Sequence, residues 1–196
     1  MARKGEERRE VIVAAAAGLF WSRGYAGTSL ADIAEAAGVP SGNMFYYFRT
    51  KAEIARAVAD VFVEETAGLV AEAQTAEAEP ERRVRYLIER LARSNRTRME
   101  KGCPIALAVR DFRAPAPDAS ARAAESFERL IAFLAQEFGR AGLKPSQALS
   151  QARALIAEWQ GGIALAHAFG DMTVLSESFR RAGELVRRIF ATAHAA

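Results

Sequence analysis

Residues 28–48 read TSLADIAEAAGVPSGNMFYYF, and this stretch decides the fold. Its first half has the apolar spacing of a short helix with one buried side, at about 29–37. The residues on that side are Leu30, Ile33, Ala34 and Ala37. The second half predicts another short helix, at about 41–47. The stretch therefore predicts two short helices joined by a tight turn.

The ends of these two helices carry residues that favour helix starts and stops. Thr28 or Ser29 can cap the first helix, and Ser29 with Asp32 fits a reciprocal capping box. Gly38 supplies the left-handed conformation that ends a helix, and Pro40 presets the backbone for the next helix. The local chemistry therefore predicts a helix-turn-helix.

The second helix has an outer side whose residue types suit DNA. Met44 and Phe48 lie four residues apart and can be buried together. The residues left for the outer side are Ser41, Gly42, Asn43, Tyr46 and Tyr47. Asparagine can pair with adenine through two hydrogen bonds, serine and tyrosine hydroxyls can donate to phosphate, and glycine lets the backbone approach closely. The major groove admits one such helix.

Two flanking residues extend this predicted DNA-binding surface. Thr28 lies where the preceding helix would meet the phosphate backbone, and Lys51 adds a cation to the positive end of the next helix. Some of these DNA-facing residues also have a purely structural interpretation. Tyr46 and Tyr47 can be packing residues, and Thr28 can be merely a helix cap.

The rest of the chain shows helical periodicity, and no segment alternates like a half-buried strand. The sequence therefore predicts an all-α protein. Further helices are expected at about 6–22, 51–70 (with an Ala/Glu stretch at 71–79 after it), 80–98, 103–112, 127–138, 146–163 and 175–189. Arginines on the helix that begins at Pro80 are expected to form a solvated face. These are Arg82, Arg83, Arg85, Arg90, Arg93, Arg96 and Arg98.

Composition leaves the function open but excludes several classes. The chain has 196 residues, of which 51% are apolar, and a net charge of +3. It is long enough for a full core, and it has no apolar run that could cross a bilayer. Cys103 is the only cysteine, so no intrachain disulfide and no multi-cysteine metal site can form. We expect a cytoplasmic protein that needs no cofactor or metal and does not bind membranes.

Three motifs carry a resemblance to the DNA-binding domain of the TetR/AcrR family of repressors. They are Gly24-Tyr25-x-x-Thr28-Ser29, Asp32-Ile33-Ala34-x-Ala36-Ala37-Gly38-Val39 and Phe45-Tyr46-Tyr47-Phe48-x-Thr50-Lys51. The resemblance implies a three-helix helix-turn-helix domain at 1–50 and a helical effector-binding and dimerisation domain at 51–196. It also implies that the DNA-facing positions are Thr28, Ser41, Gly42, Asn43, Tyr46, Tyr47 and Lys51.

The chain departs from the family pattern at three of these motif positions. Ser41 stands where many members carry lysine, Phe45 where tyrosine is usual, and Tyr46 where histidine is frequent. Loss of a lysine and of a phenolic hydroxyl weakens phosphate contacts. These positions are therefore expected to set an unusual operator preference.

A second resemblance concerns Cys103. The sequence Gly102-Cys103-Pro104-Ile105 is similar to a motif of a TetR subgroup that includes sensors of electrophiles and oxidants, and Val39-Pro40 also resembles that subgroup. A thiol at a helix N-terminus, with Arg98 and Lys101 nearby in sequence, favours the reactive thiolate. The alternative is that Cys103 is a small buried apolar residue.

The effector pocket and the dimer interface are expected among the C-terminal helices. An apolar or aromatic effector could contact Tyr86, Met99, Cys103, Leu107, Phe112, Phe127, Trp159 and His167, although aromatic residues of this kind also form ordinary cores. The expected dimer contacts are Gly161, Gly162, Leu165, Phe169, Phe179 and Val186. Small residues interleaved with large ones suit close helix packing, either across a twofold axis or inside the monomer, and the resemblance favours the dimer.

These observations predict a ligand- or redox-responsive transcriptional regulator, expected to be a repressor. It would bind a palindromic operator as a homodimer and be released by a small effector or by modification of Cys103. An enzyme that uses Cys103 with His167 or His194 is the first rival, but no orienting group or oxyanion loop accompanies them, so we expect no enzymatic activity. A helical adaptor that binds protein is the second rival.

Overall fold

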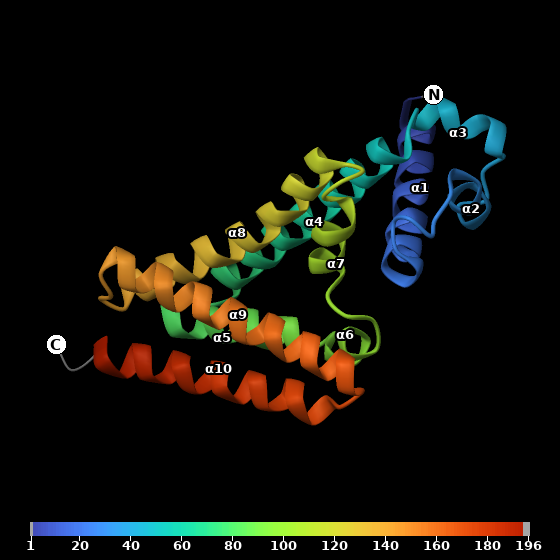
Figure 1. Ribbon diagram of the computed structural model, residues 1–196. Helices are drawn as coiled ribbons and strands as arrows, with labels where there is room; N and C mark the ends of the chain where they lie inside the picture. The colour runs from blue at the N-terminus through green and yellow to red at the C-terminus, as the bar shows by residue number, and fades with distance from the viewer. Residues whose placement is uncertain (1, 194–196) are drawn as a thin grey trace. The chain divides into compact units, whose positions relative to one another are not determined.

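The computed structural model describes residues 2–193, so the predicted alternative base His194 lies outside the described residues. The described part consists of α-helices and one 3₁₀ helix, η1, and contains no strand, which confirms the all-α prediction (Figure 1). The elements are α1 (Ala2–Arg23), α2 (Leu30–Ala36), η1 (Ser41–Asn43), α3 (Met44–Tyr47), α4 (Lys51–Ala76), α5 (Pro80–Ala92), α6 (Asn95–Lys101), α7 (Pro104–Phe112), α8 (Pro117–Arg140), α9 (Pro145–Phe169) and α10 (Met172–Ala193).

Three helices differ most from the expected pattern. Helix α8 begins at Pro117 rather than near residue 127. The helix that begins at Lys51 continues to Ala76 rather than ending near residue 70, because alanine and glutamate are strong helix formers. The helix expected from Pro80 through Arg98 is divided into α5 and α6. Arg98 Nη1 donates to the carbonyl oxygen of Leu91 at 2.5 Å. In an unbroken helix that carbonyl would accept from the backbone N–H four residues later.

The chain forms two compact units, which we call the first unit (residues 1–64 and 104–125) and the second unit (residues 65–103 and 126–196). These units do not follow the expected boundary at residue 50. An independent domain that ends at residue 50 therefore stays a prediction.

An aromatic cluster lies in the core of the first unit. The ring centroids of Phe20, Tyr25 and Phe112 are 5.3 to 5.5 Å apart. Phe112 is fully buried at the end of α7. Because Phe20 and Tyr25 belong to the end of α1 and the loop after it, α7 helps to fix the framework that carries the helix-turn-helix.

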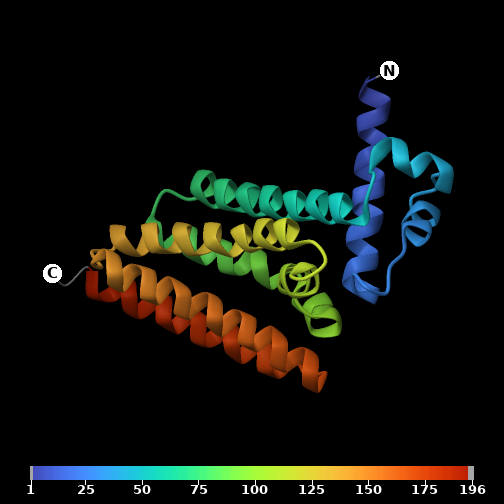
Figure 2. The ribbon, with the colours of Figure 1, turned by 45° about the horizontal axis from the view of Figure 1, so that its top comes forward.

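In the second unit, α9 and α10 run side by side along most of their length (Figures 1 and 2). Gly162 of α9 is buried against Ser178 of α10, and a Cβ atom at Gly162 would lie 2.5 Å from the Ser178 side chain. The Ser178 hydroxyl donates to the Glu158 carbonyl oxygen at 2.7 Å. Helix α6 contacts both α9 and α10, and α5 contacts α10. Within residues 2–193, no helix combines the length and the apolar character needed to cross a membrane.

Candidate nucleic-acid interface

The start of α2 is held by a reciprocal pair of hydrogen bonds. The Ser29 hydroxyl oxygen accepts from the backbone N–H of Asp32 at 3.1 Å, and the Asp32 carboxylate accepts from the backbone N–H of Ser29 at 2.7 Å. The predicted capping box is therefore confirmed, with Ser29 rather than Thr28 as the cap. Hydrogen bonds from Ser29 hold the pKa of the Asp32 carboxyl below its usual value.

The turn after α2 has the predicted conformation. Gly38 has a φ of +61°, in the left-handed region that favours glycine. The buried Val39 donates its backbone N–H to the Ala34 carbonyl oxygen at 2.9 Å. Pro40 then leads into η1 and α3, which together cover the expected second helix. We call η1 with α3 the recognition segment, residues 41–47.

The recognition segment presents polar and aromatic side chains to solvent. Met44 and Phe48 are buried, as their spacing predicted. The exposed residues are Ser41, Gly42, Asn43, Phe45 and Tyr46, whereas Tyr47 is half-buried. The side chains of Phe45 and Tyr46 are 64% and 85% exposed. The sequence indicated Phe45 only as a departure from the family pattern. In the structure, its ring is part of the exposed face of the recognition segment.

Thr28 and Lys51 lie beside the recognition segment, but their polar atoms bind the protein itself. Thr28 is only 1% exposed, and its hydroxyl donates to the Gly24 carbonyl oxygen at 2.8 Å. Lys51 Nζ donates to the carbonyl oxygens of Tyr25 and Thr28 at 2.8 Å each and lies 4.1 Å from the centre of the Tyr25 ring. Burial lowers the pKa of Lys51. Both residues therefore fasten the loop between α1 and α2.

Arg9 of α1 contacts the end of the recognition segment. Its Nη1 donates to the Tyr47 carbonyl oxygen at 2.6 Å, and its guanidinium lies 4.0 Å from the centre of the Phe48 ring. Arg9 was not among the predicted DNA-binding residues. Arg9 and Tyr47 are 38 positions apart, and no local pattern indicates such a contact.

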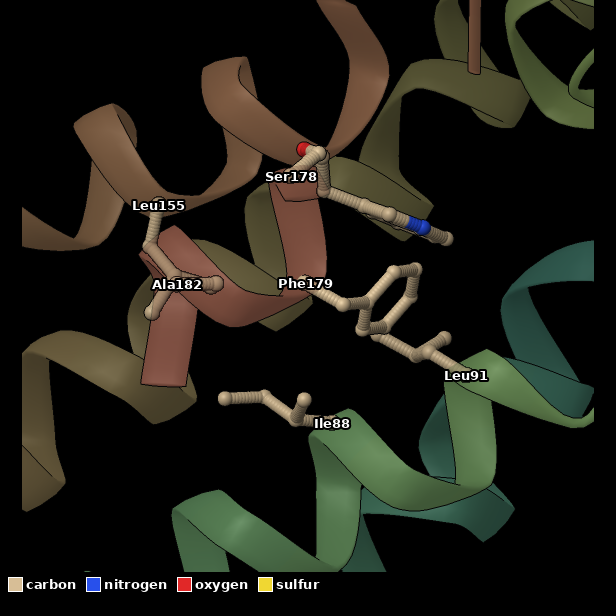
Figure 3. A pocket seen from close by; sticks show the side chains of 7 residues that line it. Ile88, Leu91, Leu155, Ser178, Phe179 and Ala182 are labelled. Carbon is tan, nitrogen blue, oxygen red and sulfur yellow. The ribbon is translucent and has the colours of Figure 1, made fainter. Parts of the chain in front are cut away.

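The second unit contains a small apolar cavity between α5, α9 and α10, with a volume of about 10 Å³. Its lining residues are Ile88, Leu91, Leu155, Trp159, Ser178, Phe179 and Ala182. The ring of Phe179 points toward Leu91 across this space (Figure 3). The cavity is much smaller than the roughly 300–1,000 Å³ of typical ligand sites.

The structure brings together only part of the predicted effector pocket. Of the predicted residues, only Trp159 lines the cavity. Phe112 lies in the core of the first unit, and Leu107 is a half-buried residue of the same unit. The others belong to the second unit. They are Tyr86, Met99, Cys103, Phe127 and His167.

Cys103 and His167 are the two described residues of the rival enzyme hypothesis. Cys103 is a free thiol, 5% exposed. His167 Nδ1 lies 2.9 Å from the carbonyl oxygen of Met99, so this ring nitrogen is engaged by the backbone. Among the described residues, no group of His, Cys, Asp and Glu could hold a metal ion.

The predicted dimer residues fall into two groups. Gly161, Leu165 and Phe169 are exposed on α9, with Leu165 at 49% and Phe169 at 68%. The others pack within the second unit. Gly162 and Val186 are buried there, and Phe179 lines the cavity.

A capped helix, a glycine turn and an exposed recognition segment within an all-α chain define a helix-turn-helix protein. The family model "Bacterial regulatory proteins, tetR family" matches residues 12–58. The model "Transcriptional regulator LmrA/YxaF-like, C-terminal domain" matches residues 80–181, which is about half of the chain. The chain belongs to the TetR family of bacterial transcriptional regulators.

Three known proteins illustrate this similarity. The regulator TtgR of Pseudomonas putida is 46% identical over 57 residues, which are 29% of this chain and only 27% of TtgR. An uncharacterized HTH-type transcriptional regulator of Lactococcus lactis subsp. lactis is 27% identical over 177 residues, 87% of this chain and 89% of that protein. The crystal structure of a TetR transcriptional regulator from Legionella pneumophila has a TM-score of 0.80 at 23% identity and covers 89% of this chain and 95% of that one, which shows a shared fold.

Proposed function

We propose that this protein is a dimeric repressor that binds a palindromic DNA operator and is released by a small apolar or aromatic effector. The observation that carries the proposal is the exposed face of the recognition segment. Asn43, Phe45 and Tyr46 extend into solvent from a segment whose start, turn and end are all fixed. A face that combines an amide, a phenol and an apolar ring suits the edges and methyl groups of base pairs.

Each exposed residue has a proposed role. Asn43 pairs with an adenine, Phe45 contacts a thymine methyl group, and the hydroxyls of Ser41 and Tyr46 donate to phosphates. Gly42 lets the backbone approach the DNA closely. Tyr47, whose ring is half-buried, contacts the DNA only through the edge of that ring.

Thr28 and Lys51 have an indirect proposed role. Because their polar atoms are bound to backbone carbonyls, we propose that they position the recognition segment for DNA. Direct contact of either residue with phosphate stays a prediction of the family resemblance.

The proposed dimer forms through the exposed apolar side of α9. Phe169 and Leu165 are large apolar residues on this face, and Gly161, one turn before Leu165, has no side chain that would hold a second copy away. A second copy of the chain would cover this face through a twofold axis. A twofold dimer presents two recognition segments, which accounts for a palindromic operator.

The proposed effector site is the cavity lined by Trp159 and Phe179. Its volume of about 10 Å³ admits no more than a water molecule. An effector must therefore open the cavity and stabilise a conformation that the free protein rarely adopts. In that conformation α4 would move and take the two recognition segments out of register with the half-sites.

Modification of Cys103 is a second proposed route to release. Cys103 is the only thiol of the chain, so a thiol-modifying oxidant or electrophile would act there. The test is release of operator DNA by oxidants and quinones from wild type and from Cys103→Ser. Unchanged release from the variant would exclude this route.

The experiment for DNA binding is selection of bound duplexes from a random pool by the full-length protein. We expect a palindromic consensus and binding that weakens steeply with salt. Asn43→Ala should lose about 1–3 kcal/mol of binding and relax specificity at one base pair per half-site. Thr75→Ala, at an exposed position on α4, is the matched control. Recovery of no consensus would contradict the proposal.

A further inference from the structure

Arg98 is a half-buried cation without a carboxylate partner. Among the described residues, no Asp or Glu oxygen lies within 4.0 Å of its guanidinium nitrogens. Its Nη1 donates to the Leu91 carbonyl and the Ser94 hydroxyl, but its Nε is buried and makes no hydrogen bond. Burial lowers the pKa of Arg98, and the nearby Cys103 thiol offsets this in part. A cation removed from water in this way favours a counter-anion.

Helices α6 and α9 contain further buried polar atoms without a hydrogen-bond partner. Six side-chain atoms in the described residues are buried without a hydrogen-bond partner, and four of them belong to α6 and α9. They are Asn95 Oδ1, Arg98 Nε, Trp159 Nε1 and Gln160 Nε2. A ligand bound between these helices would supply the partners that buried polar groups usually have. Three of the four atoms are donors, so the ligand should be rich in acceptors.

Helix α6, which carries Asn95 and Arg98, packs on α9, which carries Trp159 and Gln160. The Arg98 guanidinium carbon lies 5.1 Å from the centre of the Trp159 ring. Further along α9, His167 Nδ1 approaches the Met99 carbonyl oxygen at 2.9 Å. The guanidinium and the indole ring therefore lie next to each other and form one candidate site.

The same site is continuous with the apolar cavity. Trp159 lines the cavity, and Leu91 contributes its side chain to the cavity while its carbonyl oxygen binds Arg98. The cavity is also lined by Phe179, which is half-buried and whose ring lies beside Leu91 (Figure 3). The site therefore has a cationic, donor-rich end and an apolar end.

We propose that the effector is a small carboxylate with an aromatic or other apolar body. Its carboxylate binds Arg98 and accepts from Trp159 and Gln160, and its body displaces Phe179 and Ile88 to enlarge the cavity. A carboxylate suits the planar guanidinium and supplies the missing acceptors. This inference rests on the proposed effector-responsive function and names its ligand class.

The test compares cinnamate with cinnamamide, which has nearly the same shape but no charge. Binding to the full-length protein is measured by isothermal titration calorimetry without DNA. Wild type should bind cinnamate at least about tenfold more tightly than cinnamamide. Arg98→Met should bind the two compounds equally. Equal affinities in wild type, or no saturable cinnamate binding up to about 1 mM, would overturn the proposal.

Two further variants sharpen the test. Arg96→Met removes an exposed arginine of the same helix and should keep the wild-type preference for cinnamate. Trp159→Phe keeps an aromatic ring beside Arg98 but removes the N–H donor, so it should weaken cinnamate binding several-fold. This second variant also serves if Arg98→Met does not fold. A preference that survives in a folded Arg98→Met protein, or an unchanged cinnamate affinity in Trp159→Phe, would contradict the assignment.

Ligand binding and DNA selection can fail independently, so the two proposals are tested separately. A protein that prefers cinnamate but selects no DNA would contradict the repressor proposal alone. A protein that binds an operator but shows no preference for the carboxylate would contradict the ligand class alone.

Discussion

Arg9 fixes the end of the recognition segment from a distant part of the chain. Its guanidinium binds the Tyr47 carbonyl oxygen and covers the Phe48 ring. Arg9→Met should lower the free energy of unfolding by about 1 kcal/mol and weaken operator binding several-fold, because the segment is held less firmly. Urea denaturation and fluorescence anisotropy measure the two effects. Arg8→Met removes an equal charge from an exposed neighbour, and equal losses in both variants would show that the contact has no role.

A variant of Lys51 tests whether this residue makes an internal contact or a phosphate contact. Lys51→Met removes two hydrogen bonds to backbone carbonyls, so the free energy of unfolding should fall by about 1–3 kcal/mol. The slope of log affinity against log salt should stay unchanged, because Nζ is not free to bind a phosphate. A slope that falls by about one would instead assign Lys51 to the DNA surface. The exposed Arg49→Met is the control for a change in net charge.

Some of these residue roles follow from the sequence and others do not. Ser29 and Asp32 could be assigned because a capping box needs only residues three positions apart. The exposure of Asn43 and Tyr46 followed from helical spacing. The internal hydrogen bonds of Thr28 and Lys51 could not be predicted, since they depend on how the loop after α1 folds back onto α4.

The capping box makes the stability of α2 depend on pH. The pKa of Asp32 is lowered in the folded protein, so its stabilising effect is complete above the ordinary carboxyl pKa of about 3.9 and is lost as the pH falls through the lowered value. Wild type should therefore have a higher Tm than Asp32→Asn at neutral pH, and the difference should vanish in acid. A difference that persists at low pH would show that the charge is not responsible. Thermal unfolding followed by circular dichroism tests this.

The contact between α9 and α10 depends on the absence of a side chain at Gly162. In Gly162→Ala, the new Cβ would meet Ser178 at 2.5 Å, so the free energy of unfolding should fall by about 1–3 kcal/mol. Gly139→Ala places the same methyl group on α8, where nothing lies within 4 Å, and should raise stability by up to about 1 kcal/mol. Urea denaturation of both variants is the measurement. Similar stability of the two would mean that α9 and α10 can move apart without cost.

At the level of whole elements, most helices could be predicted from apolar spacing and from Gly and Pro. The break between α5 and α6 could not, because apolar spacing does not show that Arg98 folds back to donate to the Leu91 carbonyl oxygen. The predicted pocket failed in part for a similar reason. Spacing shows that Phe112 and Trp159 are apolar residues on helices, but it does not show that Phe112 packs in the first unit and Trp159 in the second.

For the whole molecule, the main prediction concerns assembly. Phe169 is 68% exposed on the apolar side of α9. If the proposed dimer forms, Phe169→Glu should convert it to a monomer, because the variant places a charge where a second copy would bury a ring. Sedimentation at micromolar concentration measures the mass, and operator affinity should fall with it. Ser150→Glu, which adds the same charge at an exposed position of α9, is the control. A wild-type protein that sediments as a monomer would contradict the proposed interface.

The first unit combines two separate stretches of the chain, and this has a consequence for how the protein folds during synthesis. Its core combines residues 1–64 with α7 and the start of α8, and Phe112 completes the aromatic cluster with Phe20 and Tyr25. During synthesis, at about 5–20 residues per second, the helix-turn-helix leaves the ribosome several seconds before Phe112 does. The nascent chain must therefore carry an unfinished apolar surface through that interval. The helix-turn-helix completes its core only after residues 65–103 have been made.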